Sequence, residues 1–560
     1  MAKIRRAPQG ERYDNTRPAA RGYSTQSRPA QGRSGGYSQQ PRTRSASGQA
    51  QRQRKVSFRQ MQQRRRRRRR SALLLLLQAG ASALLLFQIW RTGMLPEKLL
   101  LALGAVLLAL FVLTAAAQRH RVRGALMRLL SLALSVVLLA GSLYTQQGLT
   151  ALYRITGGLS GQTKTGVYVL AGDPAASLQD TAGYTYGRLG GLNRTDADSA
   201  AAAIRETAAA VDTAQEYQTA FELAGALYGG QVQAILMNES FVSMLEEEGS
   251  AYTDFSQRTR CVYEYAADSQ NGLQGGVTGA QAKQIVQQPF IVYLSGVDTR
   301  GDLNDRCRSD VNILAVVNPQ EHHILLVNTP RDYYVELAGA DGAKDKLTHA
   351  GLYGVDRSMA TLAALYGVDV PYYVKINFAG FIQIVDALGG ITVTSDQAFT
   401  SVGSPGYYDP TSFVKGENTL DGKAALAFAR ERHAFADGDI QRGANQMKVI
   451  SAIIDKAKSP AVLKHYSRLL DGVADSFLTN LSQDQIAALV KEQLRDGADW
   501  TVESFAVTGT SASSTQCYSA RGSKLYVMQP DEASVAQAKT RIAAVMAGTP
   551  AASESASPAA

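Results

Sequence analysis

The chain has 560 residues, too many for one compact core, and at roughly 100 to 200 residues per domain we expect several folded units. The positive charge is concentrated at the N-terminus. Residues 1–70 hold 21 Lys and Arg against two acidic residues, a net charge of +19, so the overall +11 leaves −8 for the remainder. A folded part with no excess of basic residues lacks the main electrostatic support for nucleic-acid binding, and we predict none.

Residues 1–70 are rich in Arg, Gln, Ser, Gly and Pro and poor in large apolar side chains. Such a segment cannot bury enough surface to offset its chain entropy, so we predict a disordered basic tail. It ends in seven consecutive arginines, Arg64 to Arg70. We expect the tail to bind anionic lipid head groups or to recruit acidic or biosynthetic proteins, at about 1 kcal/mol per basic residue near a membrane surface.

Three apolar runs follow, at about residues 72–89, 99–117 and 126–143, inside a predicted membrane segment 71–145. Each run is near the roughly 20 residues that a helix needs to cross a bilayer. Arginines flank the first run and the junction of the second and third, which places the tail and that junction in the cytoplasm. Three spans then put everything after about residue 146 outside the cell membrane. One alternative is that one run is a buried or interfacial hairpin helix. This would matter only if it made the number of spans even, because the later domains would then lie on the other side of the membrane.

Residues 150–285 are predicted to form a small α/β accessory domain without chemistry of its own. GVYVLAG reads as a strand, residues 196–227 form an alanine-rich helical segment, and a second helical segment covers residues 231–248. A Gly-rich stretch at about residues 272–279 marks the end of the domain.

Residues 288–545 are predicted to form an α/β layered domain. Its three central strands are FIVYLSGVD, VNILAVVNP and HHILLVNTPRD. Helical segments are expected at residues 359–366, 378–388, 422–429, 444–457, 483–495 and 532–546, interleaved with the strand candidates YYVKINF, ITVTSD and KLYVMQP. Helices that alternate with buried strands favour helices packed on a central sheet. Residues 547–560 look like a second disordered tail.

The three cysteines, Cys261, Cys307 and Cys517, show neither a CxxC pair nor metal-ligand spacing. A zinc site is therefore not expected. A disulfide between Cys261 and Cys517 stays open, because spacing alone cannot establish it.

Charged residues cluster at the ends of the predicted strands. Asp298 ends the first strand and Asp310 begins the second, so a tight return would bring both carboxylates to one end of the sheet, where they could share a Mg²⁺ with phosphate oxygens. Arg308 and Arg331 approach the same edge. The alternative for each aspartate is that it only caps a turn.

A second charged group follows about 100 residues later. Arg430 and Arg432 lie two residues apart, and in extended chain both would point the same way. Asp439, Arg442 and Gln446 share one face near a helix start, where an anion is favoured. Guanidinium groups crowded together repel one another unless an anion lies between them, so the two groups predict a diphosphate site. The alternative is surface salt bridges, such as Arg432 with Asp437 or Asp439.

Five blocks of sequence now resemble a known family. They are GVDTRGDLNDRCRSDVNILAVVNPQEHHILLVNTPRDYYVEL, KDKLTHAGLYG, FAGFIQIVDALGGITV, LDGKAALAFARERH and DIQRGANQMKVI. In this order they resemble the LytR-CpsA-Psr (LCP) family of cell-wall glycopolymer ligases, with the layout of capsule-type members. One departure is Asn445, which stands where the family usually has the second arginine of Arg-x-x-Arg-Gln.

The resemblance implies a polyprenyl diphosphate whose lipid lies in an apolar tunnel and whose head group is held among arginines and a magnesium ion. Some of the apolar face formed by Phe378, Phe381, Ile384, Val385 and Leu388 should then line the tunnel. The metal-associated carboxylates would be Asp298 and Asp310, and the diphosphate-binding residues Arg308, Arg331, Arg430, Arg432, Arg442 and Gln446.

The activity expected from these residues is transfer of a glycopolymer-1-phosphate from a polyprenyl diphosphate carrier to a peptidoglycan sugar hydroxyl, with Mg²⁺. Arg308 would stabilise the transition state. The candidate general base is Asp439, with Asp298 as the alternative. Two rival hypotheses remain: a polyprenyl diphosphate phosphohydrolase with the same site, and a non-catalytic sensor of the lipid intermediate. His322, His323, His349 and His433 show no ligand spacing and are assigned no chemistry.

Overall fold

The computed structural model describes residues 46–118, 123–156, 162–247, 250–268, 284–298, 303, 305–436, 438–457 and 477–548. It separates residues 1–70 from residues 71–560 as two units. The predicted disordered tail is wrong for residues 46–70, which belong to helix α1 (Ala46–Thr92), while residues 1–45 lie outside the described residues. Arg and Gln favour helix, and the apolar run that follows supplies the turns needed for nucleation. The tail predicted at residues 547–560 lies almost wholly outside the described residues.

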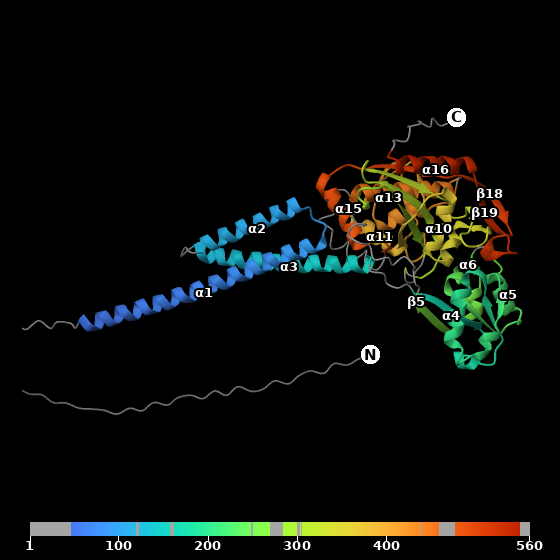
Figure 1. The fold of residues 1–560 in the computed structure, drawn as a ribbon, viewed down its shortest axis with the longest axis horizontal. Helices are drawn as coiled ribbons and strands as arrows, with labels where there is room; N and C mark the ends of the chain where they lie inside the picture. The colour runs from blue at the N-terminus through green and yellow to red at the C-terminus, as the bar shows by residue number, and fades with distance from the viewer. Residues whose placement is uncertain are drawn as a thin grey trace, which may run out of the picture. The chain divides into compact units, whose positions relative to one another are not determined.

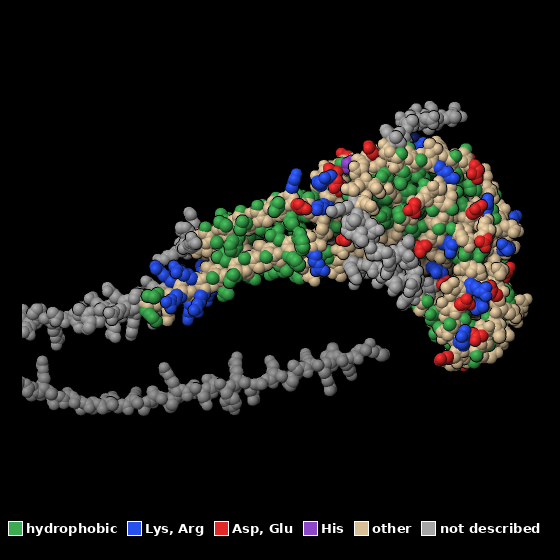
Figure 2. Space-filling view, viewed as in Figure 1, with side chains coloured by type: hydrophobic (Ala, Val, Ile, Leu, Met, Phe, Trp, Pro, Cys, Tyr) green, Lys and Arg blue, Asp and Glu red, His purple; other side chains and the backbone are tan. Residues whose placement is uncertain are grey.

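Three helices are long and apolar enough to cross a membrane, as predicted, and they anchor the chain. They are α1, α2 (Glu97–Ala117) and α3 (Arg123–Thr156), and the candidate membrane spans lie within residues 61–92, 97–117 and 124–152. Figure 2 shows apolar side chains covering their outer surfaces, as lipid-facing helices require. The buried Gln78 of α1 links the three, since its Oε1 accepts hydrogen bonds from Thr114 at 3.1 Å and Ser131 at 2.7 Å.

The accessory domain contains a five-stranded sheet. Its strands, in spatial order, are β3 (Gln215–Tyr217), β2 (Tyr186–Leu189), β4 (Ala234–Asn238), β1 (Gln162–Leu170) and β5 (Thr259–Asp268). Its α-helices are α4 (Arg194–Ile204), α5 (Ala220–Tyr228), α6 (Val242–Leu245) and α7 (Phe255–Arg258) (Figure 1). The α/β class expected for this part of the chain is confirmed.

Two helical predictions in the accessory domain are confirmed only in part, because each segment also contains a strand. The segment 196–227 contains two helices with strand β3 between them. The segment 231–248 contains the central strand β4, which is buried at every position and pairs with both β1 and β2. A short apolar run such as AILMN fits a buried strand and a buried helix equally well, so its periodicity could not distinguish them.

The second folded region has a mixed six-stranded sheet, as the sequence predicts. Its strands, in spatial order, are β16 (Phe477–Thr479), β11 (Tyr372–Asn377), β6 (Phe290–Val297), β7 (Ser309–Asn318), β8 (His323–Asn328) and β17 (Thr501–Ala506). The strands β6, β7 and β8 run antiparallel in a meander, while β11 and β17 add in parallel on either side.

Helices and small hairpins surround this sheet. The helices are α9 (Leu347–Ala350), α10 (Val355–Tyr366), α11 (Phe378–Ala387), α12 (Gly422–Arg430), α13 (Asp439–Ala457), α15 (Gln483–Asp496) and α16 (Glu532–Met546). The hairpins pair β9 (Tyr334–Glu336) with β10 (Lys344–Lys346), β12 (Ile391–Ser395) with β15 (Gly416–Leu420), β13 (Phe399–Thr400) with β14 (Ser412–Phe413), and β18 (Gly509–Ser514) with β19 (Leu525–Pro530).

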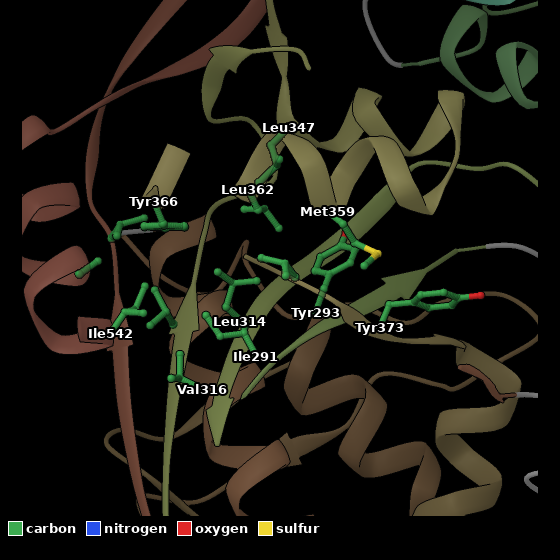
Figure 3. Packing of buried hydrophobic residues seen from close by; sticks show 14 of the residues in the cluster. Ile291, Tyr293, Leu314, Val316, Leu347, Met359, Leu362, Tyr366, Tyr373 and Ile542 are labelled. Carbon is green, nitrogen blue, oxygen red and sulfur yellow. The ribbon is translucent and has the colours of Figure 1, made fainter. Parts of the chain in front are cut away.

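The two faces of the six-stranded sheet are packed differently. One face, with Ile291, Tyr293 and Leu314, packs closely against α10 and α16 (Figure 3). Its apolar cluster has 23 buried residues and only seven half-buried ones. The opposite face, with Phe290 and Val292, meets residues of α13 and α15, and its 13 half-buried apolar residues outnumber eight buried ones. Alternate side chains of one strand thus enter a closely packed core and a layer of mostly half-buried apolar side chains.

The accessory domain and the second region share a hydrophobic cluster. Phe241 of the accessory domain packs edge-on against Tyr353, with ring centroids 5.8 Å apart. Cys517 is buried in the same cluster, and all three cysteines are free, so the Cys261–Cys517 disulfide is not formed. An ion pair between Arg306 and Asp196 of α4 adds a charged contact between the two domains.

Candidate functional site: an arginine cavity at the strand ends

The return between β6 and β7 places two predicted carboxylates together. Val297 pairs with Ser309 in the antiparallel register, so Asp298, just after β6, and Asp310, the second residue of β7, lie at the same end of the sheet. This is the arrangement expected from the sequence.

A cavity of about 270 Å³ opens at this end of the sheet, and we call it the arginine cavity. It brings together residues that lie more than 100 positions apart in the sequence. Its walls contain eight of the nine predicted site residues: Asp298, Arg308, Asp310, Arg331, Arg430, Arg432, Arg442 and Gln446. The five arginines face three carboxylates, of which Glu431 is the third, so the cavity has excess positive charge.

Arg331 is the most closely paired arginine of the cavity. Its Nη1 donates to Asp310 at 2.8 Å, its Nη2 lies 3.3 Å from Glu247, and its Nε lies 3.7 Å from Asp332. Burial opposes the charged guanidinium, but these carboxylates outweigh it and raise its pKa. Burial likewise raises the pKa of Asp310, but the surrounding arginines, Arg331 foremost, hold it below the usual value.

Glu247 is a residue of this cluster that the sequence did not reveal. It belongs to the accessory domain, and its two oxygens lie 3.3 Å from Arg331 and 3.3 Å from Arg308. Lys346 lies 3.6 Å away. Burial would raise the pKa of Glu247, but Lys346 and the arginines lower it. The acidic run at residues 246–248 was visible in the sequence, but nothing local indicated what it would contact.

Arg430 is held by three different contacts. Its Nη1 donates to Ser404 at 2.8 Å, its Nη2 lies 3.4 Å from Asp298, and its guanidinium carbon stacks 4.1 Å from the ring centre of Phe378. Arg430 ends helix α12, so the expected extended chain through Arg430 and Arg432 is wrong at the first of these residues. Both side chains nevertheless line the cavity.

Helix α13 begins at Asp439 and positions Arg442 and Gln446, as predicted. Asp439 does not line the cavity; it lies 3.2 Å from Arg442 and 4.0 Å from Arg432. Burial, assisted by Arg331 and Arg432, lowers the pKa of Arg442 despite the nearby carboxylates. Its positive charge is therefore under-compensated, as expected of an anion-binding group. The alternative partner Asp437 lies outside the described residues.

Asn445, the departure from the family pattern, does not line the cavity. It is 2% exposed and bridges two helices, donating to the Phe428 carbonyl of α12 at 3.4 Å and accepting from Gln441 at 3.1 Å. The neighbouring Gly443 permits a close approach, since a Cβ there would lie 2.2 Å from Nδ2 of Asn328 on β8. The departure thus affects helix packing rather than the walls of the cavity.

The carboxylates of the cavity suit a divalent cation whose coordination is completed by oxygens of the substrate. No group of three or more His, Cys, Asp or Glu side chains with metal-binding geometry occurs among the described residues. Mg²⁺, however, is commonly held by one or two carboxylates together with phosphate oxygens. Asp298 and Asp310 line one cavity and meet this requirement.

A buried Ser, His and Asp group lies apart from the cavity. His349 Nδ1 is 2.7 Å from Asp345 and 2.9 Å from Ser519, whose hydroxyl also donates to Asp345. In a catalytic triad the serine and the aspartate bind opposite nitrogens of the histidine, but here both contact Nδ1. All three side chains are almost completely buried. We therefore interpret this group as structural, in agreement with the sequence analysis, which assigned His349 no chemistry.

The model of the LytR_cpsA_psr family matches residues 257–543, slightly more than half of the chain. The chain belongs to the LytR-CpsA-Psr family. This LCP match begins within the accessory domain, ahead of the predicted domain start at residue 288.

Curated relatives share this part of the chain. The "polyisoprenyl-teichoic acid--peptidoglycan teichoic acid transferase TagU" of Bacillus cereus is 38% identical over 205 residues, which cover 36% of this chain and 64% of that relative. TagU of another Bacillus cereus strain is 35% identical over 243 residues, covering 43% and 75%. A solved structure, Bacillus subtilis TagT, is 30% identical, covers 47% of this chain and 92% of that one, and has a TM-score of 0.35.

Proposed function

We propose that the chain transfers a glycopolymer-1-phosphate from a polyprenyl diphosphate carrier to a sugar hydroxyl of peptidoglycan. One observation carries the proposal: five arginines and two strand-end carboxylates line one cavity that adjoins a layer of half-buried apolar side chains. Val311 belongs to both, since it lines the cavity and packs in that layer. A diphosphate with a long lipid tail also combines a charged part, which suits the cavity, with an apolar part, which suits the layer.

Family membership supports this assignment, and the names of the TagU relatives describe transfer to peptidoglycan from a polyisoprenyl carrier. For sidedness we propose the orientation predicted from the sequence, with the N-terminus in the cytoplasm and the globular domains outside. The arginine-rich end of α1 supports it. The identity of the glycopolymer is left open.

In the proposed reaction the acceptor oxygen forms a bond to the sugar-linked phosphorus, and the bond from that phosphorus to the bridging oxygen breaks. Polyprenyl phosphate leaves with the electron pair. Arg308, Arg331 and Arg430 would hold the diphosphate and stabilise charge on its oxygens. When bound, a Mg²⁺ held by Asp298 and Asp310 would neutralise further phosphate charge.

For the proton of the attacking hydroxyl we propose Asp298 as the acceptor rather than Asp439. Asp298 lines the cavity and its side chain is 45% exposed, so an incoming sugar can reach it. Asp439 is 15% exposed, and its contacts with Arg432 and Arg442 suit a role in orienting them.

The test uses the full chain in detergent with a synthetic glycan-diphosphate lipid and peptidoglycan oligomers. We expect a linked product by mass spectrometry, dependent on Mg²⁺ and lost in Arg331→Ala. Free glycan phosphate without linkage would instead indicate a phosphohydrolase. Intact lipid that remains bound to the protein would indicate a sensor.

A further inference from the structure

A second cavity, of about 550 Å³, lies beside the arginine cavity, and we call it the accessory cleft. Eleven of its fifteen lining residues belong to the accessory domain, and the other four follow strand β6. Asp298 lines both cavities. Glu246 lines the accessory cleft, while its neighbour Glu247 contacts Arg331 and Arg308 of the arginine cavity. A molecule in the accessory cleft would therefore adjoin a diphosphate in the arginine cavity.

The two cavities have opposite charge. Five carboxylates and two cationic side chains line the accessory cleft: Glu239, Glu246, Glu264, Asp298 and Asp305 against Lys164 and Arg306. The arginine cavity has five arginines against three carboxylates. Excess negative charge disfavours a polymer of phosphate groups in the cleft. Carboxylates also accept hydrogen bonds from hydroxyl groups, which an uncharged sugar chain supplies in number.

Two residues of the cleft wall each have a buried polar atom without a hydrogen-bond partner. Asn238 is 6% exposed and Ser240 is 7% exposed, yet Nδ2 of the first and Oγ of the second have no hydrogen-bond partner among the described residues. The Oδ1 of Asn238 already accepts from the Ser240 backbone at 2.9 Å, which fixes the amide and directs its donor group elsewhere. Buried polar atoms without a partner call for an explanation, and at the wall of a cavity a ligand or a water molecule can supply the missing hydrogen bond.

An aromatic side chain completes the wall. The ring of Tyr168 lies over Gly166, where an added Cβ would be only 2.6 Å from a ring carbon. It also packs against Phe255 with ring centroids 5.7 Å apart, so the ring is held in place. A fixed aromatic ring together with an amide, hydroxyls and carboxylates suits a pyranose, which has apolar C–H faces and a polar rim.

We infer that the accessory cleft binds the uncharged sugars of a glycan chain next to the reacting diphosphate. This inference deepens the proposed function by assigning a saccharide class and a place to bind it. The sugars belong either to the donor glycan or to the peptidoglycan acceptor, which share this chemistry. A poly(glycerol phosphate) chain does not fit.

The probe is chitotetraose, an uncharged tetrasaccharide, titrated into the full chain in detergent and followed by calorimetry. We expect saturable binding, and weaker binding of a poly(glycerol phosphate) of similar length. Ser240→Ala removes a hydroxyl that has no protein partner, so the fold should be unaffected while affinity falls about two- to tenfold. Ser243→Trp, placed in the cleft wall, should abolish saturable binding.

Ser199→Trp is the matched control. Ser199 lies on α4 and lines neither cavity, and its hydroxyl donates to a carbonyl four residues earlier, much as Ser243 donates to the Ser240 carbonyl. Chitotetraose binding by wild type that survives both Ser240→Ala and Ser243→Trp overturns the inference. So does absence of binding, or preference for the polyphosphate.

Two further experiments distinguish donor sugars from acceptor sugars, and failure of this inference from failure of the proposed function. Prior loading with a glycan-diphosphate lipid blocks chitotetraose if the cleft holds donor sugars, and leaves it bound if the cleft holds the acceptor. Binding of the lipid diphosphate itself is measured in parallel. If it is retained while chitotetraose fails to bind, the inference fails alone; if the lipid diphosphate is not bound, the proposed function fails.

Discussion

The arginine cavity and the Asp345–His349–Ser519 group are both clusters of charged and polar residues, but they differ in charge balance and in whether they line a cavity. In the second group, Asp345 accepts hydrogen bonds from the Ser519 hydroxyl and from two backbone amides, and contacts His349. In the arginine cavity, five lining guanidinium groups outnumber three lining carboxylates. The residues of the second group line neither of the two cavities described above. The difference indicates that residue types alone do not identify a site; an excess of one charge at a cavity wall does.

The largest effect is expected from removing a positive charge from the cavity. Arg430→Ala should lower the rate of glycopolymer transfer about 10²-fold or more, because a preorganised charge next to the phosphate is lost. The thermal midpoint should change little. Arg430→Lys keeps the positive charge but lacks the planar guanidinium, so its transfer rate should lie between those of wild type and Arg430→Ala. Equal transfer by Arg430→Ala and wild type would contradict a catalytic role.

The second prediction concerns the Asp345–His349–Ser519 group. Asp345→Ala leaves buried donors without an acceptor, and we expect it to lower the free energy of unfolding by about 3 kcal/mol or more. Affinity of the folded protein for inorganic pyrophosphate should be unchanged. Circular dichroism melts and calorimetry measure the two quantities. Ser519→Ala should lower the free energy of unfolding by about 1 kcal/mol. A variant that kept its stability but lost transfer would place this group in the active site instead.

The third prediction follows from the pKa of Asp345. Burial raises this pKa, but His349 and the hydrogen bonds from Ser519 outweigh it and lower it below the usual value. The carboxylate therefore contributes stability that is fully present above about pH 4, the unfolded pKa, and is lost as pH falls toward the folded value. As pH is lowered from 6 to 3, the thermal midpoint of the wild type should fall, and the thermal midpoint of Asp345→Asn should fall less steeply. Parallel curves would exclude this assignment.

The smallest effect is expected at Glu247. Glu247→Gln removes a negative charge from the arginine cluster, so inorganic pyrophosphate should bind about two- to fivefold more tightly at low ionic strength. Glu246→Gln is the control, because that neighbour faces the accessory cleft and should leave pyrophosphate affinity unchanged. Weaker binding by Glu247→Gln would mean that this carboxylate mainly orients Arg308 and Arg331.

Much of the site could be predicted because its residues lie at the ends of strongly patterned elements. The strands β6 to β8 were evident as short β-rich runs separated by polar turns, and the helical spacing of Asp439, Arg442 and Gln446 indicated the start of α13. These elements placed Asp298, Asp310, Arg331 and Arg442. The role of Glu247 could not be predicted, since its contacts lie 61 and 84 positions away in the sequence. Strand β4 was missed because a fully buried run has no periodicity that identifies it.

Gly443 sets a strict tolerance for this architecture. With no side chain at that position, the first turn of α13 rests directly on Asn328, three residues before Arg331. The approach of α13 to the strand edge is therefore limited by contact between the helix backbone and the Asn328 side chain. A methyl group added at Gly443 would have to displace that side chain or move α13 away from β8, which would change the distance between the guanidinium groups on the two elements although no residue lining the arginine cavity would have changed.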